Sequence, residues 1–340
     1  MRAAVIEKPG LLVVKDILPP QTGDYDALCK MLFGAVCSGT DRHLLEGVFP
    51  KQVNYPTVLG HESIGRVIQI GKKVRNYQIG DMITRVGTTQ VNGINVNWGG
   101  FAELGIAKDH RAMSEDGLPK DEWDRYRVNK VIPPDFDPAA STMIITWRET
   151  LSYITRMGIA SGARVLVIGS GGNGLSFVSH AKNLGAERVV VIGSIRRKNV
   201  GMEAGSTDYF DYKADKLIDL LRKSGLDEFD FIIDAVGKNG MMNEFLPLIK
   251  RCGIIGIYGW DDFYSNSICP NMAKGTFSYY NGGYDEEETH EKVVEYIRKG
   301  LLKADLWIDL KHPISLIDIN KAMELVKNGD VVKALVRLSD

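Results

Sequence analysis

The chain has 340 residues, of which 44% are hydrophobic and 25% charged, and its formal net charge is −1. This length suits two domains with a core each, and the composition excludes a disordered chain. The near-neutral charge argues against nucleic acid and anionic membranes as partners. The first residues lack the apolar stretch of a signal peptide, and no later apolar run could span a bilayer. We therefore expect a cytoplasmic protein with small-molecule partners.

The first third consists of short apolar runs separated by Gly, Pro and Asp. Such runs predict strands of an antiparallel, barrel-like or folded-sheet domain. They lie at 2–7, 11–17, 26–36, 63–71, 80–87 and 99–107.

From about Thr150 the apolar runs become continuous and β-branched, which is typical of strands that are buried on both faces. Between these strands, apolar residues recur every three or four positions, which predicts helices. The alternation of strands and helices along the chain predicts a doubly wound parallel sheet. The expected strands are 163–169, 188–193, 229–234 and 252–259, and the expected helices include 173–185 and 213–225. Two helices, over 288–302 and 316–329, and a strand at 333–339 end the chain.

A glycine loop follows the first of these buried strands. Gly169, Gly171 and Gly174 form the pattern G-x-G-x-x-G, with Gly172 and Asn173 inside it, and the loop opens a predicted helix. These glycines allow a tight turn and a close approach of the backbone to a pyrophosphate at the helix N-terminus. The loop therefore predicts dinucleotide binding.

The end of the next strand indicates which dinucleotide is bound. Gly193 and Ser194 stand where an NAD site usually has an acid, and Arg196 and Arg197 follow. A carboxylate would repel a 2′-phosphate, whereas a guanidinium can bind it through paired hydrogen bonds. This pattern favours NADP(H) over NAD(H), and the alternative is a solvated basic turn.

Two residues of the first third could bind a metal. Four cysteines, at 29, 37, 252 and 269, are too few for a disulfide framework, so one of them could be a ligand. Cys37 and His61 are suitable zinc ligands, although a single cysteine or histidine is more often structural.

The motifs CSGTDRH (37–43), GHESIGRVIQIG (60–71), VRNYQIGDMI (74–83) and GGFAEL (99–104), with the glycine loop, resemble the zinc-dependent medium-chain alcohol and polyol dehydrogenases. The resemblance covers nearly the whole chain. It implies a GroES-like catalytic domain over 1–149 and 287–340 and a Rossmann domain over 150–286. It also implies an active site in the cleft between the domains and a homodimer or homotetramer.

The same resemblance assigns roles to single residues. Cys37 and His61 resemble the zinc ligands, and Glu62 resembles the glutamate that binds or approaches the metal. Asp41 resembles the carboxylate that orients a ligand. Thr40 resembles the hydroxyl that passes on the substrate's proton, and His43 the outer histidine that delivers it to solvent. Zinc would act as a Lewis acid while the substrate carbon gives hydride to the nicotinamide.

The sequence departs from the family pattern in three places. The segment 84–98 has no cysteines where many relatives hold a structural zinc, so we expect one catalytic zinc only. The spacing from Cys37 to Thr40 is one residue longer than usual, and a local bulge could absorb it. The family's remaining ligand falls near Ile145, which cannot bind zinc. Glu149, one helical turn later, is a candidate ligand or a surface carboxylate, and Glu62 with water is the alternative.

Aromatic and charged residues suggest a polyol, sugar or cyclitol as the substrate. Trp147 and Arg148 occupy positions that face the substrate in the family, and the segment 258–264 reads YGWDDFY. Aromatic rings stack on the C–H faces of sugars, and carboxylates bind hydroxyl groups. The alternatives are a core role for Trp147 and a solvated turn at Asp261 and Asp262.

We therefore predict a zinc-dependent oxidoreductase that transfers hydride between a secondary alcohol and NADP(H) or NAD(H). One alternative is a zinc-free NADPH-dependent quinone or enone reductase of the same fold, which the missing ligand favours. The other is a catalytically silent nucleotide-binding protein.

Overall fold

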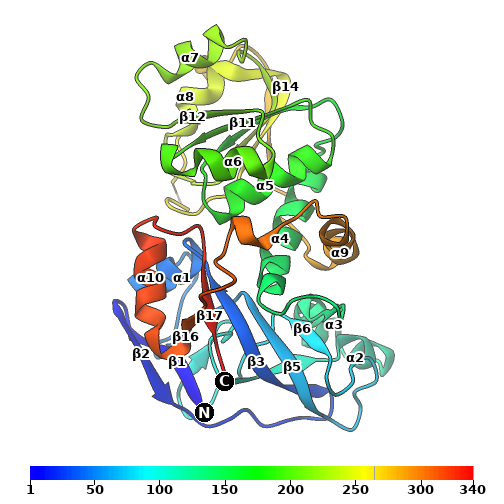
Figure 1. Cartoon of the computed structure of the whole chain (residues 1–340). Helices are drawn as coiled ribbons and strands as arrows, with labels where there is room; N and C mark the ends of the chain where they lie inside the picture. The colour runs from blue at the N-terminus through cyan, green and yellow to red at the C-terminus, as the bar shows by residue number, and fades with distance from the viewer. Residues whose placement is uncertain (264, 340) are drawn as a thin grey trace. The chain divides into compact units, whose positions relative to one another are not determined.

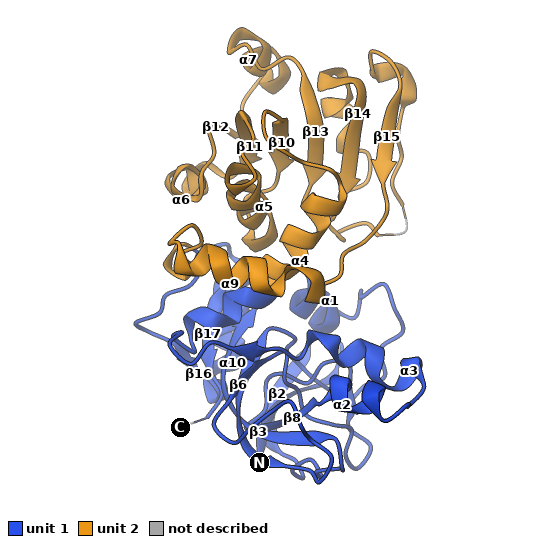
Figure 2. Ribbon diagram, turned by 90° about the vertical axis from the view of Figure 1, so that its right-hand side faces the viewer, with its two compact units in different colours: residues 1–145, 307–340 blue, residues 146–306 orange. Residues whose placement is uncertain are grey.

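The structure is a computed structural model that describes residues 1–263 and 265–339 (Figure 1). The chain divides into two compact units, Met1–Ile145 with Trp307–Asp340 (unit 1) and Thr146–Leu306 (unit 2), coloured blue and orange in Figure 2. None of the helices in the described part combines the length and hydropathy that a membrane span needs. Cytoplasmic localisation stays a prediction.

Unit 1 contains two sheets and four α-helices. Its strands are β1 (Arg2–Lys8), β2 (Leu11–Asp16), β3 (Asp26–Val36), β4 (Thr57–Val58), β5 (Ser63–Ile70), β6 (Met82–Thr84), β7 (Asn95–Val96), β8 (Leu104–Lys108), β9 (Val131–Ile132), β16 (Ile314–Ser315) and β17 (Ala334–Arg337). Its helices are α1 (Thr40–Glu46), α2 (His110–Glu115), α3 (Lys120–Trp123) and α10 (Ile319–Lys327). One sheet has the order β2-β1-β4-β7; the other has the order β16-β17-β3-β5-β6-β9, with β8 also paired to β3.

The largest core of unit 1 lies under β3, β5 and β17. Phe101 is fully buried there, and its ring occupies the space where side chains at Gly34 and Gly60 would stand. Gly60 also has φ +93°, a left-handed conformation that favours glycine. The glycine of the GHE motif is therefore required by both backbone conformation and packing.

Unit 2 contains a six-stranded parallel sheet of order β12-β11-β10-β13-β14-β15, and Figure 2 shows these strands side by side. The strands are β10 (Arg164–Ile168), β11 (Arg188–Gly193), β12 (Asp208–Asp211), β13 (Phe229–Asp234), β14 (Ile249–Ile257) and β15 (Phe277–Tyr280). The helices are α4 (Met143–Arg156), α5 (Gly172–Asn183), α6 (Lys198–Ala204), α7 (Leu217–Lys223), α8 (Met242–Phe245) and α9 (His290–Arg298). The chain switches sides of the sheet between β10 and β13, where doubly wound sheets bind ligands.

The predicted fold class is confirmed in both units, with differences at the ends of elements. Helix α7 is shorter than the predicted 213–225, because Lys216 has φ +54° and breaks the first turn. The unit boundaries lie at 145/146, inside α4, and at 306/307, whereas the sequence placed them at 149/150 and 286/287. Helix α9 lies in unit 2, since the preceding segment is tied to α4: the Thr289 hydroxyl donates to the Arg148 carbonyl at 2.9 Å.

Candidate functional site

Three strand ends of unit 1 meet at one place. Cys37 directly follows β3, and Glu62 directly precedes β5, which pairs antiparallel with β3 through Gly34 and Ser63. Strand β17 pairs antiparallel with the opposite edge of β3, and Lys333 directly precedes it. Antiparallel pairing therefore brings residues that are far apart in the sequence to one end of the sheet.

Cys37, His61 and Glu62 form a compact group of possible metal ligands. All three are buried, and their ligand atoms lie within 4.8 Å of one another. His61 Nε2 is 3.6 Å from Glu62 Oε1. A tetrahedral zinc site with bonds of about 2.0–2.3 Å separates its ligand atoms by roughly 3.3–3.8 Å. The spacing and the sulfur, nitrogen and oxygen donors therefore fit one zinc ion.

Asp41 orients two of these three residues. It is fully buried, its Oδ1 lies 3.1 Å from His61 Nδ1, and its Oδ2 accepts a hydrogen bond from the Cys37 N–H at 2.8 Å. A hydrogen bond from Nδ1 to Asp41 leaves His61 Nε2 for a metal. Burial lowers the pKa of His61, but Asp41 and Cys37 outweigh it and raise the pKa well above its ordinary value. The charge around His61 thus favours a cation there.

Lys333 is a buried neighbour of the possible metal ligands that sequence reasoning missed. Its side chain is buried, and Nζ donates to Glu62 Oε1 at 2.6 Å and to Oε2 at 2.5 Å. Burial lowers the pKa of Lys333, but the negative charges of Glu62, Cys37 and Asp41 raise it above the usual value. The signal was a lysine inside the apolar run VVKALV, where a charged residue needs a buried partner.

The glycine loop lies between β10 and α5, as the sequence predicts. Gly169 has φ +106°, and a side chain at Gly174 would overlap the Gly169 carbonyl. Gly171 precedes the helix, which begins at Gly172, followed by Asn173. The N-terminus of α5 therefore lies beside the switch point of the sheet, where folds of this type bind an anion.

The basic turn follows β11. Ser194 leads into a single 3₁₀ turn, Ile195–Arg197, and α6 follows. Arg196 is exposed and Arg197 is half-buried. Both arginines thus stand just beyond the end of the second strand, where a dinucleotide's adenosine ribose is bound in this type of fold.

Comparison with known proteins identifies related dehydrogenases. Residues 23–119 match the alcohol dehydrogenase GroES-like domain family. The chain is 25% identical over 345 residues to L-galactonate-5-dehydrogenase of Escherichia coli K12, covering 99% of this chain and 98% of that protein. It is 24% identical over 378 residues to D-arabinitol dehydrogenase 1 of Uromyces fabae, covering 99% and 97%.

A solved structure from Sinorhizobium meliloti 1021, of a protein assigned as a zinc-binding dehydrogenase and bound to NADP, matches with a TM-score of 0.77. Its sequence identity is 23%, and the match covers 99% of this chain and 98% of that one. Residues 23–119 thus belong to the alcohol dehydrogenase GroES-like domain family, and the chain is similar to named dehydrogenases over nearly its whole length. The resemblance read from its motifs is therefore confirmed.

In this alcohol dehydrogenase, helix α1 carries the predicted proton-transfer residues. The register shifts of β3 and β5 lie at 28/29 and 31/33, before Cys37, and α1 begins at Thr40, so a bulge that absorbs the extra residue between Cys37 and Thr40 stays a prediction. His43 is buried, with Nε2 3.1 Å from Arg42 Nη2, whereas the resemblance implied an outer position next to solvent. The roles of Thr40 and His43 stay predictions.

The position of the family's usual remaining ligand is filled by Ile145, which is fully buried. Glu149 lies one turn further along α4, in unit 2, and its Oε2 accepts a hydrogen bond from the Tyr258 hydroxyl at 3.2 Å. Within the described residues, the group with metal-binding spacing consists of Cys37, His61 and Glu62. Glu149 as a ligand stays a prediction.

Aromatic rings near the predicted site residues form two sets, one in each unit. Trp98 lies beside the metal group, 5.5 Å from the His61 ring and 6.0 Å from the Phe49 ring. In unit 2, Tyr258 contacts the rings of Tyr153, Phe177 and Tyr284. Trp98 belongs to none of the motifs quoted from the sequence, so its place beside His61 could not be predicted.

The weaker predictions have mixed outcomes. Trp147 is 1% exposed and is a core residue, the alternative that the sequence had left open. Arg148 is fully buried and pairs with Glu286 at 2.7 Å; that it faces the substrate stays a prediction. Asp262 accepts a hydrogen bond from the Asn239 N–H at 2.9 Å. Tyr264 lies outside the described residues.

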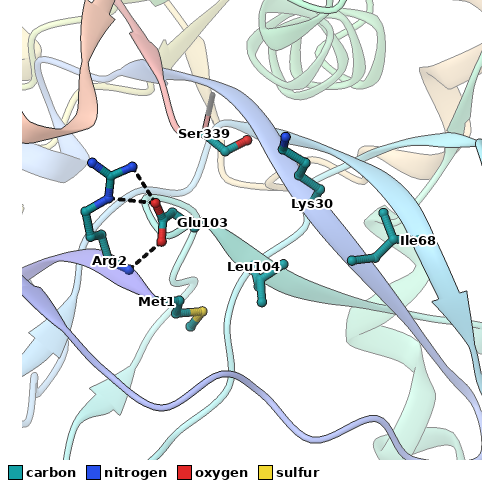
Figure 3. Close-up of a pocket in the computed structure, with 7 residues that line it drawn as sticks. All are labelled: Met1, Arg2, Lys30, Ile68, Glu103, Leu104 and Ser339. Atoms are coloured by element: carbon teal, nitrogen blue, oxygen red, sulfur yellow. Dashed lines mark hydrogen bonds and ion pairs between the residues drawn. The ribbon is translucent and has the colours of Figure 1, made fainter.

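A hollow of about 380 Å³ lies on unit 1 (Figure 3). Its lining residues are Met1, Arg2, Lys30, Ile68, Glu103, Leu104 and Ser339. Arg2 donates to the Glu103 carboxylate through its backbone N–H and its Nε, at 2.7 and 2.6 Å. None of the predicted site residues lines this hollow, so it is not part of the predicted site.

Proposed function

We propose that this chain, an NAD(P)-dependent dehydrogenase of CH–OH groups, uses one catalytic zinc and NADP(H) to oxidise a secondary alcohol of a polyol, sugar or cyclitol. The observation that carries the proposal is the buried group of Cys37, His61 and Glu62, with Asp41 hydrogen-bonded to the first two. In the reverse direction the same site reduces the corresponding carbonyl.

The metal would be held by the Cys37 thiolate, by His61 through Nε2 and by the Glu62 carboxylate. When bound, zinc polarises the substrate oxygen as a Lewis acid and lowers the free energy of charge development on it. Asp41 keeps His61 in the tautomer that presents Nε2. Lys333 holds both oxygens of Glu62 and thereby limits how much negative charge this ligand offers the metal.

The substrate's hydroxyl proton leaves through helix α1. The Thr40 hydroxyl accepts this proton while it donates its own, and His43 on the next turn receives it. Since His43 is buried and its Nε2 lies 3.1 Å from Arg42, the proton reaches solvent past the Arg42 side chain.

The cofactor is bound by unit 2. The glycine loop and the N-terminus of α5 bind the pyrophosphate, and the bound dinucleotide accepts or supplies the hydride. Ser194, Arg196 and Arg197 bind the 2′-phosphate of NADP, and the absence of an acid at positions 193 and 194 supports this preference. The Sinorhizobium protein was solved with NADP bound, which also supports it.

Substrate recognition by hydroxyl groups rests on two observations. The relatives from Escherichia coli and Uromyces fabae are named for L-galactonate and D-arabinitol, both polyhydroxylated compounds. Trp98 offers an aromatic face beside His61, on which the C–H face of a sugar could stack. The active form is a homodimer or homotetramer, an expectation that comes from the family.

One observation favours a zinc-free reductase as the second candidate. Lys333 already contacts both oxygens of Glu62, so only Cys37 and His61 would hold the metal firmly. Two protein ligands bind zinc far more weakly than the three that catalytic sites use.

Metal analysis of the purified protein tests the proposal. We expect about one equivalent of zinc in the wild type, less than about a tenth in Cys37→Ala, and unchanged zinc in Cys29→Ala, which alters the other buried cysteine. A polyol and sugar screen with NADP and NAD, read by absorbance of the reduced cofactor, measures turnover. Chelator-resistant turnover of a quinone or enone in zinc-free protein would establish the second candidate instead.

A further inference from the structure

The end of strand β11 shows how the cofactor preference is built into unit 2. Gly193 is the last residue of β11, and its carbonyl accepts a hydrogen bond from the Tyr212 N–H at 3.0 Å. Gly193 is buried, and its place in the sheet is where a dinucleotide fold usually positions a ribose-binding carboxylate. What surrounds this glycine therefore decides whether an acid could stand there.

Two side chains fill the space beside Gly193. A Cβ atom at this position would lie 2.5 Å from Ser170 Cβ, Ser170 Oγ and the Tyr209 hydroxyl oxygen. The Tyr209 ring also packs against Gly201 of α6, where a Cβ atom would lie 2.6 Å from the ring. Contacts this short do not occur in folded proteins without displacement of a neighbour. Two glycines thus make room for one tyrosine, and any side chain at position 193 must displace Ser170 or Tyr209.

The same two hydroxyl groups hold the next peptide from both sides. The Tyr209 hydroxyl donates to the Ser194 carbonyl at 2.6 Å, and the Ser194 N–H donates to Ser170 Oγ at 3.1 Å. Ser194 is the residue from which the 3₁₀ turn of Arg196 and Arg197 starts. These two hydrogen bonds therefore fix the direction in which the chain leaves β11 and enters the basic turn.

Tyr209 lies close enough to the basic turn for electrostatic interaction. Burial raises the pKa of Tyr209, while a hydrogen bond with Ser170 and the positive charge of Arg197 counteract the rise. Tyr209 is only 8% exposed, so its hydroxyl serves this internal contact rather than solvent.

We infer that Tyr209 and Ser170 are specificity-determining positioning residues for the cofactor. They exclude a carboxylate at Gly193 by occupying its space, and they hold the peptide of Ser194 so that the basic turn meets the 2′-phosphate of NADP. The inference rests on the proposed preference for NADP(H). It adds that the preference depends on a buried tyrosine of strand β12 that does not contact the phosphate.

The inference separates the two positions at which an acid could be introduced. At Gly193 an aspartate must displace Ser170 or Tyr209, and the displaced residue releases Ser194. At Ser194 the backbone has φ −64° and ψ 132°, an extended conformation that any residue adopts. Ser194→Asp should therefore favour NADH over NADPH, whereas Gly193→Asp should weaken the binding of both cofactors.

Direct binding of NADPH and NADH to the intact protein, followed by fluorescence of the reduced nicotinamide, tests the inference. Tyr209→Phe removes one hydroxyl and keeps the ring against Gly201. We expect its Kd for NADPH to rise roughly three- to tenfold, the range for one lost hydrogen bond, with a change below about twofold for NADH. Tyr296→Phe, at a buried tyrosine of α9, is the matched control and should change neither constant.

The ratio of the two dissociation constants decides the outcome. A merely structural role of Tyr209 would raise both constants together and leave their ratio unchanged, which would overturn the inference. Gly193→Asp protein that binds NADH as tightly as the wild type would also overturn it. If the wild type itself binds NADH and NADPH equally well, the proposed cofactor preference fails. In that case an unchanged ratio in Tyr209→Phe overturns the inference as well.

Discussion

Replacing Lys333 with Met tests whether this ammonium group is what neutralises Glu62. Both side chains are almost fully buried, at 2% and 1% exposure, and Lys333 Nζ contacts both carboxylate oxygens at 2.5–2.6 Å. Removing one partner of a buried ion pair costs about 3–5 kcal/mol, because the other charge stays in the interior. This is a large part of the roughly 5–15 kcal/mol that stabilises a folded domain. We expect Lys333→Met to lower the free energy of unfolding of unit 1 by this amount.

Urea unfolding in the presence of chelator, followed by far-UV circular dichroism, measures the loss. Lys327→Met, at an exposed lysine of α10, is the matched control and should change the stability by less than about 0.5 kcal/mol. Zinc at 100 times its Kd should add about 2.7 kcal/mol to the wild type. The same zinc concentration should raise the free energy of unfolding of Lys333→Met by more, because the metal ion then neutralises the Glu62 carboxylate. A loss in chelator no larger than that of Lys327→Met would refute this reasoning.

Three further predictions concern the cores. Gly60→Ala should lower the free energy of unfolding by roughly 2–5 kcal/mol, because the side chain would be strained at a left-handed φ and would overlap Phe101. Gly158 has φ +94° but open space around it, so in urea unfolding the control Gly158→Ala should show the loss from backbone strain alone. Arg148→Met should cost about 3–5 kcal/mol, and replacing its buried carboxylate partner as well should recover most of this in a double-mutant cycle. Burial lowers the pKa of His180 to about 3, so folding opposes its protonation. Because the unfolded chain binds this proton below about pH 6.5, stability should fall by up to about 1.4 kcal/mol per pH unit from pH 6.5 towards 3. The same unfolding series on His180→Leu should lack this contribution, and an equal slope in both proteins would contradict it.

The sequence predicts the elements of unit 2 well because their signals are local. Strands such as Arg164–Ile168 and Arg188–Gly193 are continuous apolar runs, and the glycine loop joins the first of them to a helix. The unit boundaries are harder to predict because they depend on contacts between distant residues. The segment before α9 is tied to α4 by Arg148 and Glu286, which are 138 positions apart.

In the candidate site as well, residues within short motifs could be predicted from the sequence, whereas contacts between distant segments could not. Cys37, Asp41 and His61 could be named from two short motifs, and the structure brings them together. Lys333 could not be assigned, because its contact with Glu62 is made only when β17 pairs with β3. The burial of His43 also depends on packing around α1 that no motif encodes.

The charges around Cys37 bear on the proposal that zinc is bound without a ligand at position 145. The Cys37 thiolate, the Asp41 carboxylate and the Glu62 carboxylate each carry one negative charge. The Lys333 ammonium carries one positive charge. With His61 neutral, as a metal ligand must be, the buried group has an excess of two negative charges, which a divalent cation balances. A further carboxylate ligand would leave the metal-bound site with a surplus negative charge. Charge balance therefore favours Cys37, His61 and Glu62 as the complete protein ligand set, with the fourth position left for substrate oxygen.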